Sequence, residues 1–283
     1  MTQEDLNKIK EILVDSNKII ELDEKVNFYI KEFIKNNNEE DFSKNEAFSD
    51  DEFISRINKY EEISEDLEQV VILLGRWGKD EHLPIIEKLF KRISENNSDN
   101  NGVPVWLSLQ WYPILLFIYL ITIAALSNNN YKIIKAVLEV KIKITDYEVY
   151  PLITLITRVS EIDKHFSLLN ENKNFKTPRS EYFYRNLKTN LEELIFLGKD
   201  YEYYFDECEM LIALVYAHIN KHDWGMVGRF YWKHEERFES SPLKEMREDA
   251  KRLGDEWSPL KARLFNGSFD EFLKTKLKYC KED

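Results

Sequence analysis

Glycine, proline and cysteine are scarce in this chain of 283 residues, which contains 8 Gly, 7 Pro and 2 Cys. A β-sandwich or β-barrel needs a turn every few residues, so the shortage of Gly and Pro argues against those folds. Cys208 and Cys280 are too few for a disulfide framework, which fits a reducing compartment. The N-terminus is charged from Glu4 onward and shows no secretory signal. These absences predict a cytoplasmic protein.

Motifs that bind nucleotides or form known catalytic sites are also absent. The sequence has no GxxxxGK[ST], GxGxxG or GxSxG motif and no cysteine array with zinc spacing. Its formal net charge of -12 argues against broad contact with a nucleic acid backbone. We therefore expect no cofactor and no nucleic acid partner.

Charge is missing entirely from Val105–Leu126 (VWLSLQWYPILLFIYLITIAAL), although 33% of the chain is charged. A membrane-spanning helix needs about 20 apolar residues, and Pro113 leaves only the shorter stretch from Ile114 uninterrupted. No basic cluster flanks the run to orient it in a bilayer. The pattern favours a buried core helix. A single-span membrane protein anchored by Val105–Leu126 is the alternative, in which the aromatic residues near its start would form an interfacial belt.

Apolar residues recur at steps of three and four in most of the remaining sequence, which predicts an all-α fold. We expect an irregular multi-helix bundle around the central apolar helix. Residues 1–49 would form a short N-terminal helical arm and acidic linker, and residues 50–283 a helical core domain. Ser64, followed by acidic residues, predicts a helix start, and Gly75 and Gly78 predict its end. A helix from Tyr131 is expected to run into a short extended piece ending at Ile144. Further helices are expected over residues 80–93, 151–169, 180–197 and 202–221, with later helix starts near residues 242, 259 and 268.

Two histidines provide the best candidate for a metal site. His218 and His222 lie four residues apart in a segment predicted to be helical, a spacing that brings two imidazoles onto one face. Ile219 stands where the metalloprotease motif requires Glu. Two surface histidines near a helix C-terminus, where a cationic imidazole is favourable, are the preferred interpretation. We therefore predict no metal, and keep a metal-dependent hydrolase or nuclease using His218 and His222 as the alternative.

Glu139-Val140-Lys141 matches part of a metal-dependent nuclease motif. That motif also needs a carboxylate on a neighbouring strand shortly upstream. The nearest upstream Asp is Asp99, which lies beyond the apolar run. An exposed Glu–Lys pair is the favoured interpretation.

The segment WGMVGRFYW combines two glycines, an arginine and several aromatic residues more densely than any other part of the chain. A GxxG loop allows close approach to a phosphate, whereas a tight helix junction packed on the core gives the same composition. Aromatic and Arg side chains are the usual anchors of protein interfaces. We predict a partner or ligand site here, formed by Trp224, Arg229, Phe230 and Trp232.

Three segments together resemble a known helical region. They are LLGRWGKDEHLPIIEKL, WYPILLFIYLITIAALSNNNY and YFDECEMLIALVYAHI with WGMVGRFYW, covering roughly residues 64–232. Their order and spacing resemble a region found C-terminal to effector domains in bacterial SIR2-like, TIR-like and ATP-binding anti-phage defence proteins. The resemblance implies a soluble accessory module without catalytic residues. Two glycines of that pattern are replaced here by Leu120 and Ile121.

The function expected from these observations is non-catalytic. The chain would be a helical sensor or assembly module of a prokaryotic anti-phage defence system, binding an effector subunit or another copy of itself, with no membrane partner. The N-terminal 50 residues are too short for a TIR or SIR2 domain. The effector would then be a separate chain, or this sequence would be part of a longer protein.

Overall fold

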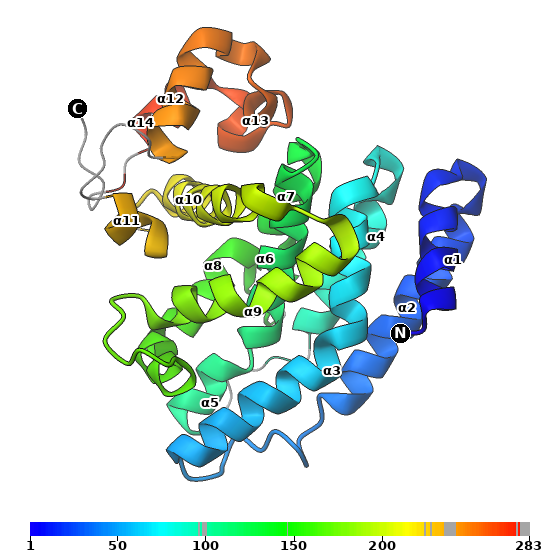
Figure 1. The fold of residues 1–283 in the computed structure, drawn as a ribbon, viewed down its shortest axis with the longest axis vertical. Coiled ribbons are helices and arrows are strands. Elements are labelled where there is room, and N and C mark those ends of the chain that lie inside the picture. The colour runs from blue at the N-terminus through cyan, green and yellow to red at the C-terminus, as the bar shows by residue number, and fades with distance from the viewer. Residues whose placement is uncertain are drawn as a thin grey trace.

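Helices form nearly all of the regular structure in the computed structural model, which confirms the all-α prediction (Figure 1). It describes residues 1–95, 97, 101–145, 147–223, 225, 226, 228–234, 242–275 and 277, with the backbone alone for residues 232–234. The helices surround α6 (Tyr112–Leu126), and α5 (Pro104–Leu109) leads into it. The fold is thus an irregular bundle built around one central helix.

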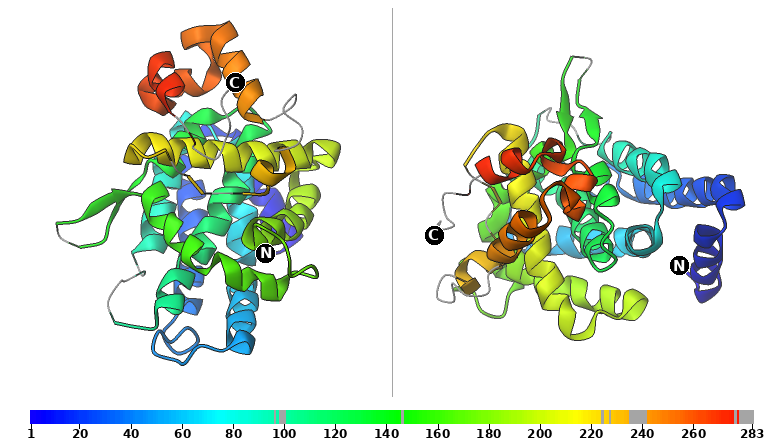
Figure 2. Two further views of the ribbon diagram at one scale, coloured as in Figure 1. Left: turned by 90° about the vertical axis from the view of Figure 1, so that its left-hand side faces the viewer. Right: turned by 90° about the horizontal axis from the view of Figure 1, so that it is seen from above.

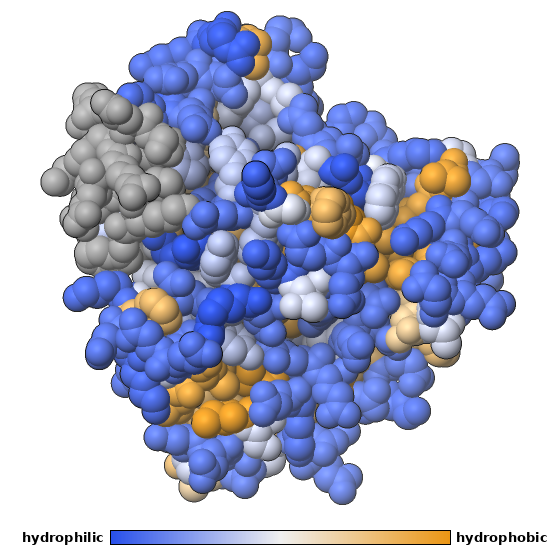
Figure 3. Space-filling model, in the orientation of Figure 1, coloured by the Kyte–Doolittle hydropathy of each residue, from blue (hydrophilic) through white to orange (hydrophobic). Residues whose placement is uncertain are grey.

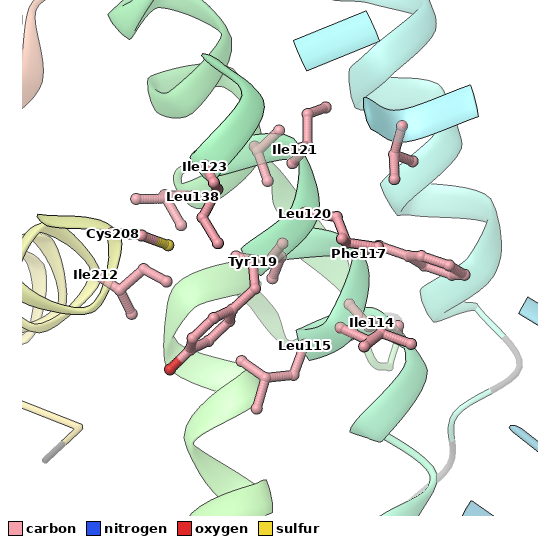
Figure 4. Packing of buried hydrophobic residues seen from close by; sticks show 14 of the residues in the cluster. Ile114, Leu115, Phe117, Tyr119, Leu120, Ile121, Ile123, Leu138, Cys208 and Ile212 are labelled. Carbon is pink, nitrogen blue, oxygen red and sulfur yellow. The ribbon is translucent and has the colours of Figure 1, made fainter. Parts of the chain in front are cut away.

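Every residue of α6 is buried by neighbouring helices. Pro113 lies in the first turn, where its missing N–H costs no helical hydrogen bond. A helix that is apolar on all sides is stable in water only when it is covered on all sides. Figure 4 shows its side chains directed outward on several faces, with Cys208 and Ile212 of α10 (Tyr201–Asn220) packed beside Tyr119. The apolar run, long enough to cross a membrane by length and composition, is therefore enclosed by the protein itself.

The long helix α3 (Asp50–Trp77) makes the most extensive packing against α6. It begins after Ser49, whose side chain accepts a hydrogen bond from the backbone N–H of Glu52. The predicted start at Ser64 is wrong, because Ser64 is buried in the middle of this helix. Gly75 is also internal, and a Cβ there would lie 2.5 Å from the carbonyl oxygen of Ile121. Glycine at this position therefore permits the close approach of α3 to α6.

The N-terminal segment packs against the body. Buried faces of α1 (Gln3–Val14) and α2 (Ile19–Asn36) join the same hydrophobic core as α6. Phe33 meets Phe117 of α6 edge to face, with ring centroids 5.6 Å apart. In the predicted linker, Phe42 is buried and stacks on Tyr60 at 4.1 Å. The expected arm and linker thus contribute to the core.

The second half of the chain covers the other sides of α6. The helices from α12 (Pro242–Leu253) to α14 (Phe269–Lys274) form a layer over α10 (Figure 1). A small antiparallel hairpin projects from the body in both views of Figure 2, with Ile142 paired to Tyr150. The extended piece predicted near Ile144 is its first strand. The remaining elements are η1 (Ser16–Lys18), η2 (Asp80–His82), α4 (Leu83–Ser94), α7 (Tyr131–Leu138), β1 (Lys141–Lys143), β2 (Val149–Pro151), α8 (Leu152–Ile156), η3 (Thr157–Leu169), α9 (Pro178–Ile195), η4 (Gly198–Asp200), α10 (Tyr201–Asn220), α11 (Arg229–His234), α12 (Pro242–Leu253), η6 (Gly254–Glu256), α13 (Ser258–Lys261), η7 (Leu264–Gly267) and α14 (Phe269–Lys274).

Candidate functional site

The two glycines of the predicted ligand loop pack directly against α10. A Cβ on Gly225 would lie 2.7 Å from the backbone of Ala213, and one on Gly228 would overlap the carboxylate of Glu209. Glu209 and Ala213 are one helical turn apart on α10. The two glycines of the GxxG segment therefore lie against two positions of α10 that are one turn apart. Their lack of side chains lets this segment pack closely against α10.

Arg229 lies in the same segment and is largely enclosed. Its guanidinium carbon lies 3.6 Å from the ring centroid of Tyr184. Its nitrogens lie 3.5 Å from Glu181, 3.3 Å from Glu202 and 3.7 Å from Asp206. Three carboxylates thus offset its charge, and only 13% of the side chain is exposed. Arg229 ties α11 to α9 and α10.

The other predicted partner-binding residues are only partly placed. Phe230 is 1% exposed and belongs to the core, so its ring is not available to a partner on the surface. Trp224 and the side chain of Trp232 lie outside the described residues. A partner contact through Trp224 and Trp232 therefore stays a prediction, whereas Arg229 and Phe230 have structural roles.

The histidine pair does not share one helical face. Helix α10 ends at Asn220, and Lys221 adopts a left-handed conformation with φ of 53°, so His222 lies beyond the helix. His218 is half-buried, its ring contacts that of Phe265, and burial lowers its pKa. In the part of the chain that the structure describes, no group of three or more His, Cys, Asp or Glu side chains is arranged to hold a metal ion. The geometry gives the zinc alternative no support.

Glu139 belongs to no group of described His, Cys, Asp or Glu side chains that could hold a metal ion. Glu139 caps the C-terminus of α7 and pairs with Lys135 one turn earlier, at 2.5 Å. Lys141 is exposed on β1. Glu139 is thus half-buried and paired with Lys135, and only the exposed position of Lys141 matches the favoured interpretation.

A buried polar network that was not predicted joins α6, α9 and α10. The hydroxyl of Tyr119 donates to Oε1 of Glu209 at 3.0 Å, and Glu209 is buried. Beside it, Arg179 forms a bond to Asp163 at 2.6 Å and is itself buried. Burial raises the pKa of Glu209 to about 7 and holds the pKa of the neighbouring Cys208 thiol well above its usual range, which makes that thiol unreactive. The network connects three helices, while Oε2 of Glu209 and one nitrogen of Arg179 are buried without a hydrogen-bond partner among the described residues.

The raised pKa of Glu209 predicts that stability falls as pH rises. In the unfolded chain a Glu titrates near its ordinary value of about 4.3. Between these two pH values Glu209 is protonated in the folded state and ionised in the unfolded chain. The contribution of Glu209 to the free energy of unfolding is therefore fully present below the lower pH and is lost as pH rises through about 7. Glu209→Gln, which keeps an acceptor for Tyr119, is expected to be about 1–3 kcal/mol more stable than wild type at pH 8.

This difference is measured by urea unfolding between pH 5 and pH 8, and it should shrink toward pH 5. The buried Glu68 and Glu207, with pKa values raised by burial to about 8 and about 7, titrate in both proteins and cancel in the comparison. Glu4→Gln, at an exposed position, is the control and should follow wild type. If the free energies of unfolding of Glu209→Gln and wild type change in parallel between pH 5 and pH 8, Glu209 is already ionised in the folded protein at pH 5.

The hairpin is the most prominent exposed feature among the described residues (Figure 2). Its turn holds Tyr147, which is 97% exposed, and β2 adds the exposed Val149 and Tyr150. Its base is anchored by Ile142, which is buried. An aromatic tip held away from the body on a buried base is suited to contact another protein.

The hairpin edges, in contrast, are unsuited to strand pairing. The backbone N–H of Leu152 donates to the carbonyl oxygen of Val140, and the N–H of Ile144 donates to that of Glu148. Because hydrogen-bonded and non-hydrogen-bonded positions alternate in an antiparallel pair, the backbone N–H and C=O groups of Lys141 and Lys143 point outward. Exposed lysines on an edge strand discourage pairing with another strand. On β2, Pro151 has no N–H to donate. The side chains at the tip, and not the strand edges, are therefore the available contacts.

No family model matches the chain, and no curated protein or solved structure matches it either.

Proposed function

We propose that this protein is a non-catalytic helical sensor or assembly module that binds a protein partner through the tip of the β1–β2 hairpin. The resemblance of its central segments to accessory regions of anti-phage defence proteins supports a role in such a system. The partner would be an effector subunit, or a second copy of this chain, in the cytoplasm. The enclosure of α6 by other helices supports a module that works away from the membrane.

The observation that carries this proposal is the exposure of Tyr147, Val149 and Tyr150 on a projecting element. Tyrosine supplies a large contact area with few rotatable bonds, and it is enriched at the energetic centres of interfaces. An isolated two-stranded hairpin has little stability of its own, so contacts at its tip contribute little to the fold. Elsewhere, the face shown in Figure 3 is largely hydrophilic, with hydrophobic residues in separate patches.

The test replaces both tyrosines of the tip, as Tyr147→Ser/Tyr150→Ser. Proteins encoded beside the gene are purified, and their affinity for wild type and variant is measured by titration calorimetry. We expect at least about a tenfold loss of affinity, since hot-spot side chains contribute roughly 2 kcal/mol or more. The melting temperature should stay unchanged, because both side chains are exposed.

The matched control is Phe196→Ser, which removes an 83% exposed aromatic residue at the end of α9. It should bind the partner as wild type does. If the hairpin variant also binds as wild type does, the tip is not the interface. If neither a neighbouring gene product nor a second copy binds wild type, the assembly role is refuted.

A further inference from the structure

Helices α12 to α14, with the short turns η6 and η7 between them, form a C-terminal layer over residues 242–274 that lies on α10 (Figure 1). The layer has a small core of its own, in which the ring centroid of Phe272 lies 4.7 Å from that of Trp257 and 5.1 Å from that of Phe265. All three side chains are buried. The layer contacts the body of the protein at α10 and α7. A group of helices with its own core can open as one unit while the rest of the protein stays folded.

Glu207 is a buried carboxylate at the boundary between the body and this layer. It lies on α10 and is only 7% exposed. The hydroxyl of Tyr131 on α7 donates to its Oε1 at 3.0 Å. Within the described residues it forms no ion pair with a Lys, Arg or His side chain. A single neutral hydroxyl compensates only in part for the hydration that an ionised carboxylate loses on burial.

The layer places negative charge beside Glu207. Glu245 and Asp249 lie one turn apart on α12, and both raise the pKa of Glu207. Asp249 pairs with Arg252 at 2.5 Å, so its charge is partly offset. The titratable side chains of α10 that interact with Glu207 have raised pKa values and stay neutral at pH 7, and they are Tyr203, Tyr204 and Cys208. The charges that reach Glu207 from α12 thus oppose its ionisation.

Enclosure by the layer changes the protonation of Glu207. Burial is the largest cause, and together with Glu245 and Asp249 it raises the pKa of Glu207 to about 7, whereas the hydrogen bond from Tyr131 lowers it. Once the layer opens, the carboxyl group meets water and titrates near its ordinary value of about 4.3. Opening therefore releases a proton between these two pH values. The contribution of Glu207 to closure is fully present below about 4.3 and is lost as pH rises through about 7.

We propose that the C-terminal layer is a pH-sensitive cover of α10, which is held closed while the carboxyl group of Glu207 carries its proton and opens more readily once that group ionises. Opening uncovers the buried face of α12, which includes Leu243, Met246 and Ala250, and the part of α10 beneath it. The helices around α6 stay packed. The layer shares no residue with the hairpin, so its opening does not depend on a partner at the hairpin tip.

The experiment follows amide hydrogen exchange of full-length wild type and Glu207→Gln by mass spectrometry between pH 5 and pH 7.5. Gln keeps an acceptor for Tyr131 but cannot ionise. The two proteins are compared at the same pH, so the pH dependence of the intrinsic exchange rate cancels. For peptides from α12, the ratio of the wild-type rate to the variant rate should rise roughly fiftyfold between pH 5 and pH 7.5, because opening releases one proton. An unchanged ratio would overturn the proposal.

Glu209→Gln is the matched control, because it makes the same change two positions further along α10. Glu209 bonds to Tyr119 of α6, and burial raises its pKa to about 7 as well. It stays enclosed when only the layer opens, so α12 should exchange in Glu209→Gln as it does in wild type at every pH. Peptides from α6 should exchange more slowly in Glu209→Gln than in wild type at pH 7.5, since they exchange through global unfolding. If Glu209→Gln slows exchange of α12 as much as Glu207→Gln does, α12 opens only when the whole protein unfolds, and the proposal fails.

Two further variants test whether the neighbours of Glu207 set the pH of opening. Glu245→Gln/Asp249→Asn removes the opposing charges and should lower the pH at which the exchange of α12, corrected for the intrinsic rate, levels off. Tyr131→Phe removes the hydrogen bond that favours the ionised carboxylate and should raise that pH. Shifts in these two directions support the proposal, and unchanged or reversed shifts in both variants contradict it.

Discussion

Replacing Phe117 by alanine is expected to lower the free energy of unfolding by about 3–5 kcal/mol. Phe117 is fully buried in α6, and the ring of Phe33 from α2 packs against it edge to face. Truncation removes a large apolar contact and leaves a cavity that the surrounding helices fill only in part. The measurement is urea unfolding followed by circular dichroism, in buffer without detergent.

Phe28→Ala provides the comparison, because Phe28 of α2 is 57% exposed. Its effect should stay within about 0.5 kcal/mol of wild type. Equal stabilities of Phe117→Ala and Phe28→Ala would mean that α6 is not packed by the surrounding helices. A requirement for detergent to keep wild type in solution would point to the same conclusion.

Replacing Arg179 by methionine is the second substitution with a large expected effect, a loss of about 3–5 kcal/mol. Arg179 is buried. Its Nε donates to Oδ1 of Asp163 at 2.6 Å, and its Nη2 donates to Oδ2 of the same carboxylate at 3.3 Å. Burial raises the pKa of Asp163, and the guanidinium opposes that rise by stabilising the ionised carboxylate. Removing the cation leaves this carboxylate without its compensating charge. Urea unfolding at pH 7 measures the loss.

Arg252→Met removes a cation of the same kind from the surface, where it pairs with Asp249 on α12. Its cost should stay below about 1 kcal/mol, because exposed pairs are weak. The double variant Arg179→Met/Asp163→Leu should recover part of the loss, since it removes the isolated charge as well. Additive effects of the two single substitutions would show that Arg179 and Asp163 do not interact.

The helical fold could be predicted because the apolar residues keep a helical period through most of the chain. The start of α3 could not, since Ser49 and Ser64 are both followed by acidic residues and only tertiary packing distinguishes them. Of the two glycines expected to end that helix, Gly78 does follow its last residue, Trp77, whereas Gly75 lies inside it, against Ile121. A glycine that ends a helix and one that permits close packing look alike in a single sequence.

The sites were harder to predict than the helices. Glu209 is one of 52 acidic residues, and its partner Tyr119 is 90 positions away, so no local pattern marks the pair. Lys221 ends α10 in a left-handed conformation that the sequence does not signal, because glycine is the usual residue there. That turn separates His222 from His218. The composition of WGMVGRFYW fits a surface anchor and a packed junction equally, and the structure encloses Arg229 and Phe230.

The enclosure of α6 has a consequence for how the chain is made. Helix α3 precedes α6 in the sequence, but α9 and α10, which cover its other sides, end only at Ile195 and Asn220. At about 5–20 residues per second, a ribosome needs roughly 5–20 seconds to synthesise the chain from the end of α6 to the end of α10. Until the end of that interval the most apolar segment of the nascent polypeptide lacks part of its cover, because α9 and α10 are not yet complete. We therefore expect that chaperones which shield this segment until the later helices emerge raise the yield of folded protein.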